Sequence, residues 1–232
     1  MENEYKFAVS NFQKTKDSNM YKFKYIHKWC LEYSKFLIDE VHYKRNIKTD
    51  PTLRKKYKKY KKGTIIYAKL GINIGNEFSG NHFCLVLNKK DTIFNPIITV
   101  VPLTSSDTKH NILINENILQ VATVILHKQA KVIADELINH ARKLYQTGDE
   151  ITQELIDISN NLEEKSKDLF KVYDRYQRYE KHSTYANILN VTTISKDRIT
   201  KINKYDPSGE MSYSEDIIQM VDEKIKNRFL NI

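Results

Sequence analysis

The sequence predicts an α+β protein, in which a small β-sheet follows an N-terminal helix and is interrupted by a long pair of helices. Short runs rich in β-branched residues, separated by Gly and Asn-Pro turns, occupy the middle of the chain. Apolar residues at helical spacing dominate both flanks. Only six Gly and four Pro among 232 residues argue against a turn-rich all-β protein, and 40% hydrophobic with 29% charged residues indicates a globular chain.

The first element is expected to be a helix over residues 16–43. Its apolar residues follow each other at spacings of three and four, which places them on one face: Phe23, Ile26, Cys30, Tyr33, Leu37 and Val41. Asp50-Pro51 then ends regular structure, because a residue before proline is disfavoured in the helical conformation.

Five short segments are expected to be strands, separated by turn residues such as Gly71, Gly75, Gly80 and Asn95-Pro96. Three are clear apolar runs and two are shorter candidates. The expected strands are residues 64–70, 82–87, 97–103, 111–114 and 187–194.

Between the last two expected strands, apolar residues at helical spacing predict two long helices joined by the turn 147–149. The second helix carries a heptad seam that only Lys165 interrupts, formed by Ile151, Leu155, Ile158, Leu162, Leu169, Val172, Tyr176 and Tyr179. We expect residues 150–181 to pack antiparallel against 118–145. After the turn 206–209, residues 214–230 should form a final amphipathic helix with Ser214 as its N-cap.

These elements suggest four consecutive parts. Residues 1–60 hold the N-terminal helix and a basic linker, 61–115 the first part of the sheet domain, 116–182 the inserted helical hairpin, and 183–232 the completion of the sheet and the C-terminal helix. We expect the N-terminal helix and the hairpin to pack together as a second layer.

The net charge of +9 is concentrated in one segment. Residues 44–62 contain ten Lys or Arg and one Asp, so the rest of the chain is neutral. Such a segment, with Tyr57 and Tyr60 interleaved, can bind a polyanion such as RNA, or can be a solvated linker, and both interpretations stay open. The candidate RNA-binding residues are Arg54, Lys55, Lys56, Lys58, Lys59 and Lys62.

Other classes of protein are disfavoured. No apolar run reaches the roughly 18 to 20 residues of a membrane span, and residues 1–17 lack the apolar core of a signal peptide, so a cytoplasmic protein is expected. Cys30 and Cys84 are expected to be reduced, buried thiols. Glu136 and His140, one helical turn apart, are expected to be surface residues, and we expect no metal or cofactor.

Several segments, in order, resemble the PemK/MazF toxins. They are the basic-Gly start KGTIIY at 62–67, the LG pair at 70–71 with the loop and strand GNEFSGNHFCLVL at 75–87, and the strand end VVPLTS at 100–105. STYA at 183–186 and TISKDRI at 193–199 are similar to the family's last strand and the start of its C-terminal helix. The resemblance covers a minority of the chain.

The resemblance implies a small SH3-like β-barrel that forms a homodimer and is inhibited by an antitoxin protein. It also implies a metal-independent endoribonuclease, in which the 2′-hydroxyl of the RNA attacks the adjacent phosphate. That reaction needs a proton acceptor at the hydroxyl, a proton donor at the leaving oxygen, and donors around the phosphate. The alternative is an inactive barrel that binds RNA or another protein, the latter through the heptad helix.

The resemblance also indicates site residues. His82 stands where the family has its catalytic arginine, with Phe83 in place of the following proline, and Thr104 stands at the catalytic threonine. Histidine cannot reproduce the bidentate phosphate contact of arginine, but it can transfer a proton near neutral pH. His82 could instead be a strand residue bonded to a carbonyl, and Thr104 a strand-end hydroxyl bonded to the backbone.

Further candidates surround these two. Glu77 matches the acidic residue of the family loop and could act as a base or orient His82, and Ser105 lies next to Thr104. Asn81, with the backbone amides of residues 75–80, could form a small anion nest. Cys84 shares a strand face with His82 and could be a nucleophile, although a core position is the simpler interpretation.

Overall fold

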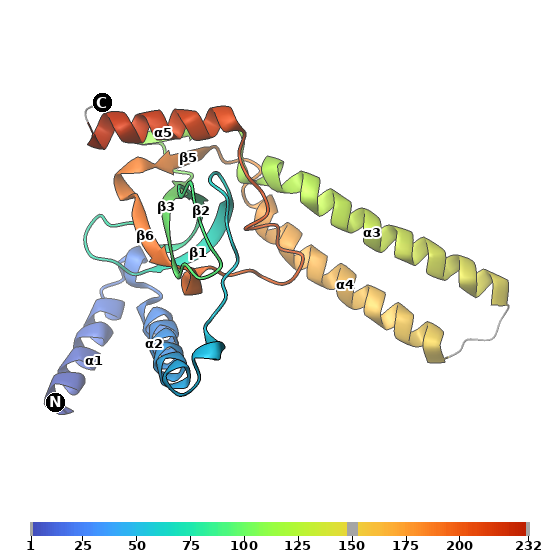
Figure 1. Cartoon of the computed structure of the whole chain (residues 1–232), viewed down its shortest axis with the longest axis horizontal. Helices are drawn as coiled ribbons and strands as arrows, with labels where there is room; N and C mark the ends of the chain where they lie inside the picture. The colour runs from blue at the N-terminus through green and yellow to red at the C-terminus, as the bar shows by residue number, and fades with distance from the viewer. Residues whose placement is uncertain (1, 148–152, 231–232) are drawn as a thin grey trace.

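The computed structural model describes residues 2–147 and 153–230. Over these ranges an antiparallel sheet carries helices on several sides, and a long helical hairpin projects away from it (Figure 1). The helices are α1 (Glu2–Asp17), α2 (Ile26–Thr49), α3 (Ile118–Thr147), α4 (Gln153–Gln177) and α5 (Glu215–Phe229). The expected α+β class is confirmed.

The sheet contains six strands within the described part of the chain: β1 (Ile65–Gly71), β2 (Gly80–Val86), β3 (Ile97–Thr104), β4 (Asn111–Ile114), β5 (Thr184–Asn187) and β6 (Thr192–Ser195). Their order is β1-β2-β3-β5-β4, and β6 pairs with the first half of β3. The pairing does not close into a barrel. Single bridges from Thr64 to Ser212 and from Ala68 to Ile199 instead cover the outer edge of β1.

Both faces of this sheet are buried, which explains why its central strands are continuous apolar runs. One face, with Phe83 and Leu85 of β2, packs against the base of the hairpin and against α5. The other face, with Cys84 and Val86, forms a second core that also includes Tyr60 from the basic segment. Alternate residues of β2 therefore enter different cores.

The expected strand 187–194 is wrong as a single element. β5 ends at Asn187, a 3-10 turn spans Ile188–Asn190, and β6 begins at Thr192. The turn lets the chain pair with both ends of β3, because β5 contacts Leu103 and Thr104 while β6 contacts residues 97–100.

The N-terminal region also differs from expectation. In place of one helix over 16–43, α1 ends at Asp17 and α2 begins only at Ile26, after a 3-10 turn. Asn19 lies between them with φ 56°, a left-handed conformation that interrupts a helix. Of the expected apolar stripe only Ile26 is fully buried. α1 and α2 lie on another side of the sheet from the hairpin (Figure 1), so the expected second layer is wrong.

The helical hairpin is formed as expected. Leu155, Leu162, Val172 and Tyr176 are buried on α4, and α3 runs antiparallel beside it (Figure 1). Lys165, the exception in the seam, places its ammonium group 2.5 Å from Glu136 of α3. The expected turn at 147–149 and the seam residue Ile151 lie outside the described residues, except for the backbone of Thr147.

The C-terminal part closes the sheet domain. α5 begins directly after Ser214, as predicted, and buries Ile218 and Val221. The segment 193–199, however, does not begin a C-terminal helix. It contains the end of β6 and a single 3-10 turn over Lys196–Arg198.

Candidate functional site

The register of the sheet brings the two main candidates together. β2 and β3 are antiparallel, with Cys84 opposite Pro102. Continuing that register by two residues places His82 opposite Thr104, and residues opposite each other in antiparallel strands point to the same side. The recorded pairing of β2 and β3 ends at Cys84 and Pro102, so His82 and Thr104 lie just beyond the paired residues of the two strands.

A cavity of about 180 Å³ lies at this point. His82, Thr104, Asn81 and Ser105, four of the residues that the sequence singles out, line it together. The cavity is therefore formed by the start of β2 and the end of β3, where the glycine-rich loop enters the sheet.

His82 is held in place by the backbone. Its Nε2 lies 3.0 Å from the carbonyl oxygen of Ser79, to which it can donate a hydrogen bond, and the carbonyl of Leu103 lies near the ring as well. The ring also packs edge-on against Phe78, with 4.4 Å between centroids. Burial lowers the pKa of His82 below its usual 6.5, and the two carbonyl partners only partly oppose this, so the neutral imidazole predominates at neutral pH. The contacts of the ring are those of an ordinary strand histidine. The ring is also unprotonated, which is the form that a general base needs.

Thr104 is half-buried at the end of β3. Its Oγ1 accepts a hydrogen bond from the amide of Ser106 at 3.1 Å. This contact occupies one lone pair and leaves the hydroxyl hydrogen to donate, because a hydroxyl has one O–H and two acceptor positions. Thr104 can thus be oriented by the backbone and still donate to a phosphate oxygen.

Six further residues line the cavity, and three of them carry polar side chains that the sequence reasoning did not select as site residues. Tyr179 follows α4, and Ser183 and Thr184 lead into β5. The ring of Tyr179 lies 5.3 Å from that of Phe83, and burial raises the pKa of its phenol. Ser183 and Thr184 were visible only as part of a strand motif, and Tyr179 only as a heptad position. The end of the hairpin insertion thus forms one wall of the candidate site.

Glu77 does not join this group. It lines a different cavity, together with Phe78, Asn190 and Arg198. The hydrogen-bond partners of His82 are backbone carbonyls, so Glu77 does not orient the ring. A turn over residues 74–77 within the glycine-rich loop sets the position of its backbone.

Two of the backbone amides in the expected anion nest are bonded within the protein. The amide of Glu77 donates to the carbonyl of Ile74 at 3.1 Å, and the amide of Phe78 donates to Asn190 Oδ1 at 2.9 Å. The loop uses these donors to stabilise its own fold, so they are not directed at a ligand.

The other reactive side chains are structural. Cys84 is fully buried, and burial raises the pKa of its thiol, which disfavours the thiolate a nucleophile needs. Both cysteines are free, but Cys30 is only half-buried, so the expectation of two buried thiols holds for Cys84 alone. His140 is buried, with its Nε2 2.9 Å from the hydroxyl of Ser159, so the expectation that it is a surface residue is wrong. Within residues 2–147 and 153–230 no group of three His, Cys, Asp or Glu is placed to hold a metal ion.

The basic segment is largely docked onto the sheet domain. Its lysines reach carboxylates far away in sequence: Lys55 pairs with Asp197, Lys58 with Glu210 at 3.4 Å, and Lys62 with Asp222. Arg54 stacks on the ring of Phe94. Lys56 and Lys59 remain exposed to solvent. Three of the seven Lys and Arg in residues 54–62 are thus paired with carboxylates.

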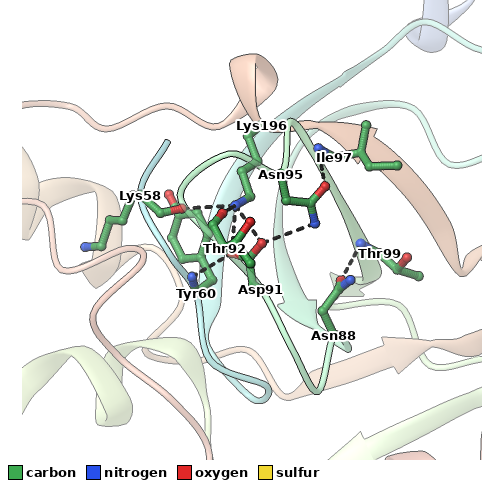
Figure 2. A network of polar contacts seen from close by, with 9 residues as sticks. All are labelled: Lys58, Tyr60, Asn88, Asp91, Thr92, Asn95, Ile97, Thr99 and Lys196. Atoms are coloured by element: carbon green, nitrogen blue, oxygen red, sulfur yellow. Dashed lines mark hydrogen bonds and ion pairs between the residues drawn. The ribbon is translucent and has the colours of Figure 1, made fainter. Parts of the chain in front are cut away.

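A buried ion pair fixes the same segment (Figure 2). Lys196 Nζ lies 2.6 Å from Asp91 and also donates to the backbone carbonyl of Lys58 at 3.1 Å. Asp91 in turn accepts a hydrogen bond from the amide of Tyr60 at 2.9 Å. Burial raises the pKa of Asp91, but the hydrogen bonds from Lys196 and Tyr60 and the positive charge of Lys196 lower it more.

The fold is a small antiparallel-sheet domain, and His82 and Thr104 line one cavity at the ends of two neighbouring strands. Residues 61–158 match the family model of the PemK-like, MazF-like toxin of type II toxin–antitoxin systems, so the resemblance seen in the sequence is confirmed. The matched stretch includes β1 to β4 and α3, whereas α1, α2, β5 and β6 lie outside it.

Two further findings bear on the class of protein. No curated protein matches the chain. Among the helices of the described residues, none combines the length and the apolar character needed to cross a lipid bilayer.

Proposed function

We propose that this protein is a toxin that cleaves RNA without a metal ion, and that His82 and Thr104 form its active site. The observation that carries the proposal is the cross-strand placement of these two residues in one cavity, inside the stretch that matches the toxin family. As in the family, we propose a homodimer, an antitoxin partner and action in the cytoplasm. The open sheet with its two edge bridges is proposed to be a variant of the family barrel.

In the proposed reaction the neutral imidazole of His82 takes the proton of the RNA 2′-hydroxyl. The 2′-oxygen forms a bond to the adjacent phosphorus, the bond to the 5′-oxygen breaks, and the leaving oxygen takes a proton from water. The products are a 2′,3′-cyclic phosphate and a 5′-hydroxyl end. The Thr104 hydroxyl donates to a phosphate oxygen, where negative charge grows in the transition state.

The environment of His82 supports the role of a base. A buried imidazole with a lowered pKa is unprotonated at neutral pH and can accept a proton. In the neutral ring, the nitrogen that donates to a carbonyl carries the hydrogen, and the other nitrogen is the one that can accept the proton of the substrate hydroxyl. The side chains of Asn81 and Ser105, both exposed, are within the same cavity and can bind the flanking phosphate or base.

Cleavage of a long RNA in EDTA, with the new 5′ ends mapped, tests this function. His82→Ala and Thr104→Val should each reduce the rate by roughly 10²-fold. The matched controls are His42→Ala, an exposed histidine of α2, and Thr99→Val on the same strand as Thr104. Equal cleavage by wild type and both site variants would refute the proposed site.

One observation favours a second function, a binding module without catalysis. The ring of His82 has backbone carbonyl partners like those of a structural histidine, and the arginine of the family is absent. A wild-type protein that binds RNA but leaves every RNA intact would support this alternative. Binding of a protein partner that depends on α4, without RNA binding, would support the protein-interaction form of it.

A further inference from the structure

A second, larger cavity lies on the other side of His82. It has a volume of about 640 Å³ and separates the segment 21–32, which leads into α2, from the loop between β1 and β2. Tyr25, Lys28 and Trp29 belong to one wall, and Gly71, Asn81 and His82 belong to the other. We call this space the Tyr25 cleft. Its first wall lies outside the stretch that matches the toxin family.

The wall formed by residues 21–32 is docked onto the loop. Gly71 has φ 93°, and a Cβ atom there would lie 2.3 Å from the ring of Trp29, so the indole needs the bare glycine backbone. Lys22 donates to the carbonyl of Gly75 at 2.6 Å, and Glu32 pairs with Lys69 of β1 at 2.6 Å. The cleft is therefore a formed feature of the fold, and His82 is one of the residues that line it.

The same wall exposes aromatic rings beside positive charges. The side chain of Tyr21 is 86% exposed and that of Tyr25 is 50% exposed. Lys24 and Lys28 lie 5.5 Å and 5.3 Å from the centroid of the Tyr25 ring. Glu32, the acidic residue of this wall, forms an ion pair with Lys69. Exposed aromatic rings with unneutralised lysines are the features that bind single-stranded nucleic acid, by stacking on bases and contacting phosphates.

We propose that the Tyr25 cleft binds single-stranded RNA and leads it to His82. Bases stack on Tyr21 and Tyr25, Lys24 and Lys28 contact phosphates, and Trp29 holds the wall in position. This inference rests on the proposed function, since it supplies the substrate path for the same site. It assigns the RNA contacts nearest His82 to this segment, in addition to any made by residues 54–62, where three of the seven Lys and Arg pair with carboxylates.

The test uses the full chain and a fluorescein-labelled RNA of about 12 nucleotides, a length suited to one single-strand site. Every 2′-hydroxyl is replaced by 2′-O-methyl, so the probe cannot be cut. The Tyr21→Ala/Tyr25→Ala variant should bind it at least about tenfold more weakly. Tyr5→Ala/Tyr145→Ala, which also removes two exposed tyrosines, should bind like wild type. Lys28→Ser should weaken binding more than Lys35→Ser on α2.

Cleavage of unmodified RNA by the same variants separates this inference from the proposed function. Unchanged affinity of Tyr21→Ala/Tyr25→Ala, with cleavage by wild type, would overturn the cleft and leave the active site standing. Weakened binding with no cleavage by wild type would support the cleft and overturn the endoribonuclease. Unchanged RNA affinity with loss of a dimer in sedimentation would assign the cleft to a protein interface and overturn the inference.

Discussion

Lys196 and Asp91 form an ion pair in which the two side chains are 2% and 0% exposed. The pair connects three segments, because Lys196 also bonds the backbone of the basic segment and Asp91 lies between β2 and β3 (Figure 2). Breaking such a pair leaves an isolated buried charge, which costs more than the pair itself contributes. The pair therefore holds residues 58–60 against the sheet.

The first prediction concerns this pair. Lys196→Met should lower the free energy of unfolding by about 3–5 kcal/mol, since Asp91 would be left buried without its cation. Lys196→Met/Asp91→Leu should recover part of that loss. Urea unfolding measures both, with Lys89→Met, an exposed lysine, as the control. Equal stability of Lys196→Met and wild type would show that the pair contributes nothing to the fold.

The second prediction concerns the helical hairpin. Leu162 is buried between α4 and α3, so Leu162→Asp should destabilise the hairpin by roughly a few kcal/mol. Its neighbour Asn161 is exposed, and Asn161→Asp introduces the same charge outside the seam. Circular dichroism during thermal unfolding should separate the two. A stable, fully helical Leu162→Asp protein would contradict the packing of this face.

The third prediction concerns the basic segment. Changing Lys55, Lys56, Lys58 and Lys59 together to Ser should flatten the salt dependence of RNA binding if the segment contacts phosphates. The double variant Lys56→Ser/Lys59→Ser should cause most of the decrease in salt dependence, because Lys55 and Lys58 already pair with carboxylates. Binding measured from about 50 to 200 mM salt checks this. If the fourfold variant shows the same salt dependence of RNA binding as wild type, the segment does not contact RNA and serves only as a linker.

The fourth prediction concerns pH. The cleavage rate should fall at acidic pH, in a limb that lies below pH 6.5, since the lowered pKa of His82 keeps the base unprotonated further into the acid range. The free energy of unfolding should also decrease at acidic pH. The unfolded chain protonates this histidine near pH 6.5 and the folded chain only at lower pH, so the free energy of unfolding falls as pH drops through that window.

The variants of His82 complete this prediction. His82→Ala should remove the acidic limb together with roughly 10²-fold of the rate, and it should also remove the contribution of this residue to the loss of stability. His82→Arg should not restore the base, because arginine stays protonated; full activity of this variant would mean that the residue acts on the phosphate as a cation and not as a base. An acidic limb that is unchanged in His82→Ala would assign the titrating group to another residue.

Part of the site could be predicted from the sequence. The strand motifs singled out His82, Thr104, Asn81 and Ser105, and all four line one cavity. Glu77 was a reasonable candidate by position, but the loop turns its backbone donors inward and places the side chain in another cavity. Tyr179 could not be found, because a tyrosine at a heptad position looks like any other seam residue.

The sequence by itself determined the local elements. Periodicity specified the central strands, α5 and the hairpin, because alternating or heptad patterns record which side of an element is buried. A glycine-rich loop followed by an apolar run was enough to locate the start of β2.

Tertiary structure alone decided how these elements meet. The register that sets His82 opposite Thr104 depends on pairing between distant strands, and the split of residues 187–194 into β5 and β6 depends on both pairing with β3. The exposure of the apolar stripe on α2 and the ion pairs of Lys55, Lys58 and Lys62 were likewise invisible in the sequence. Which partner a face or a charge receives is set by residues far away in the chain, and local patterns carry no record of them.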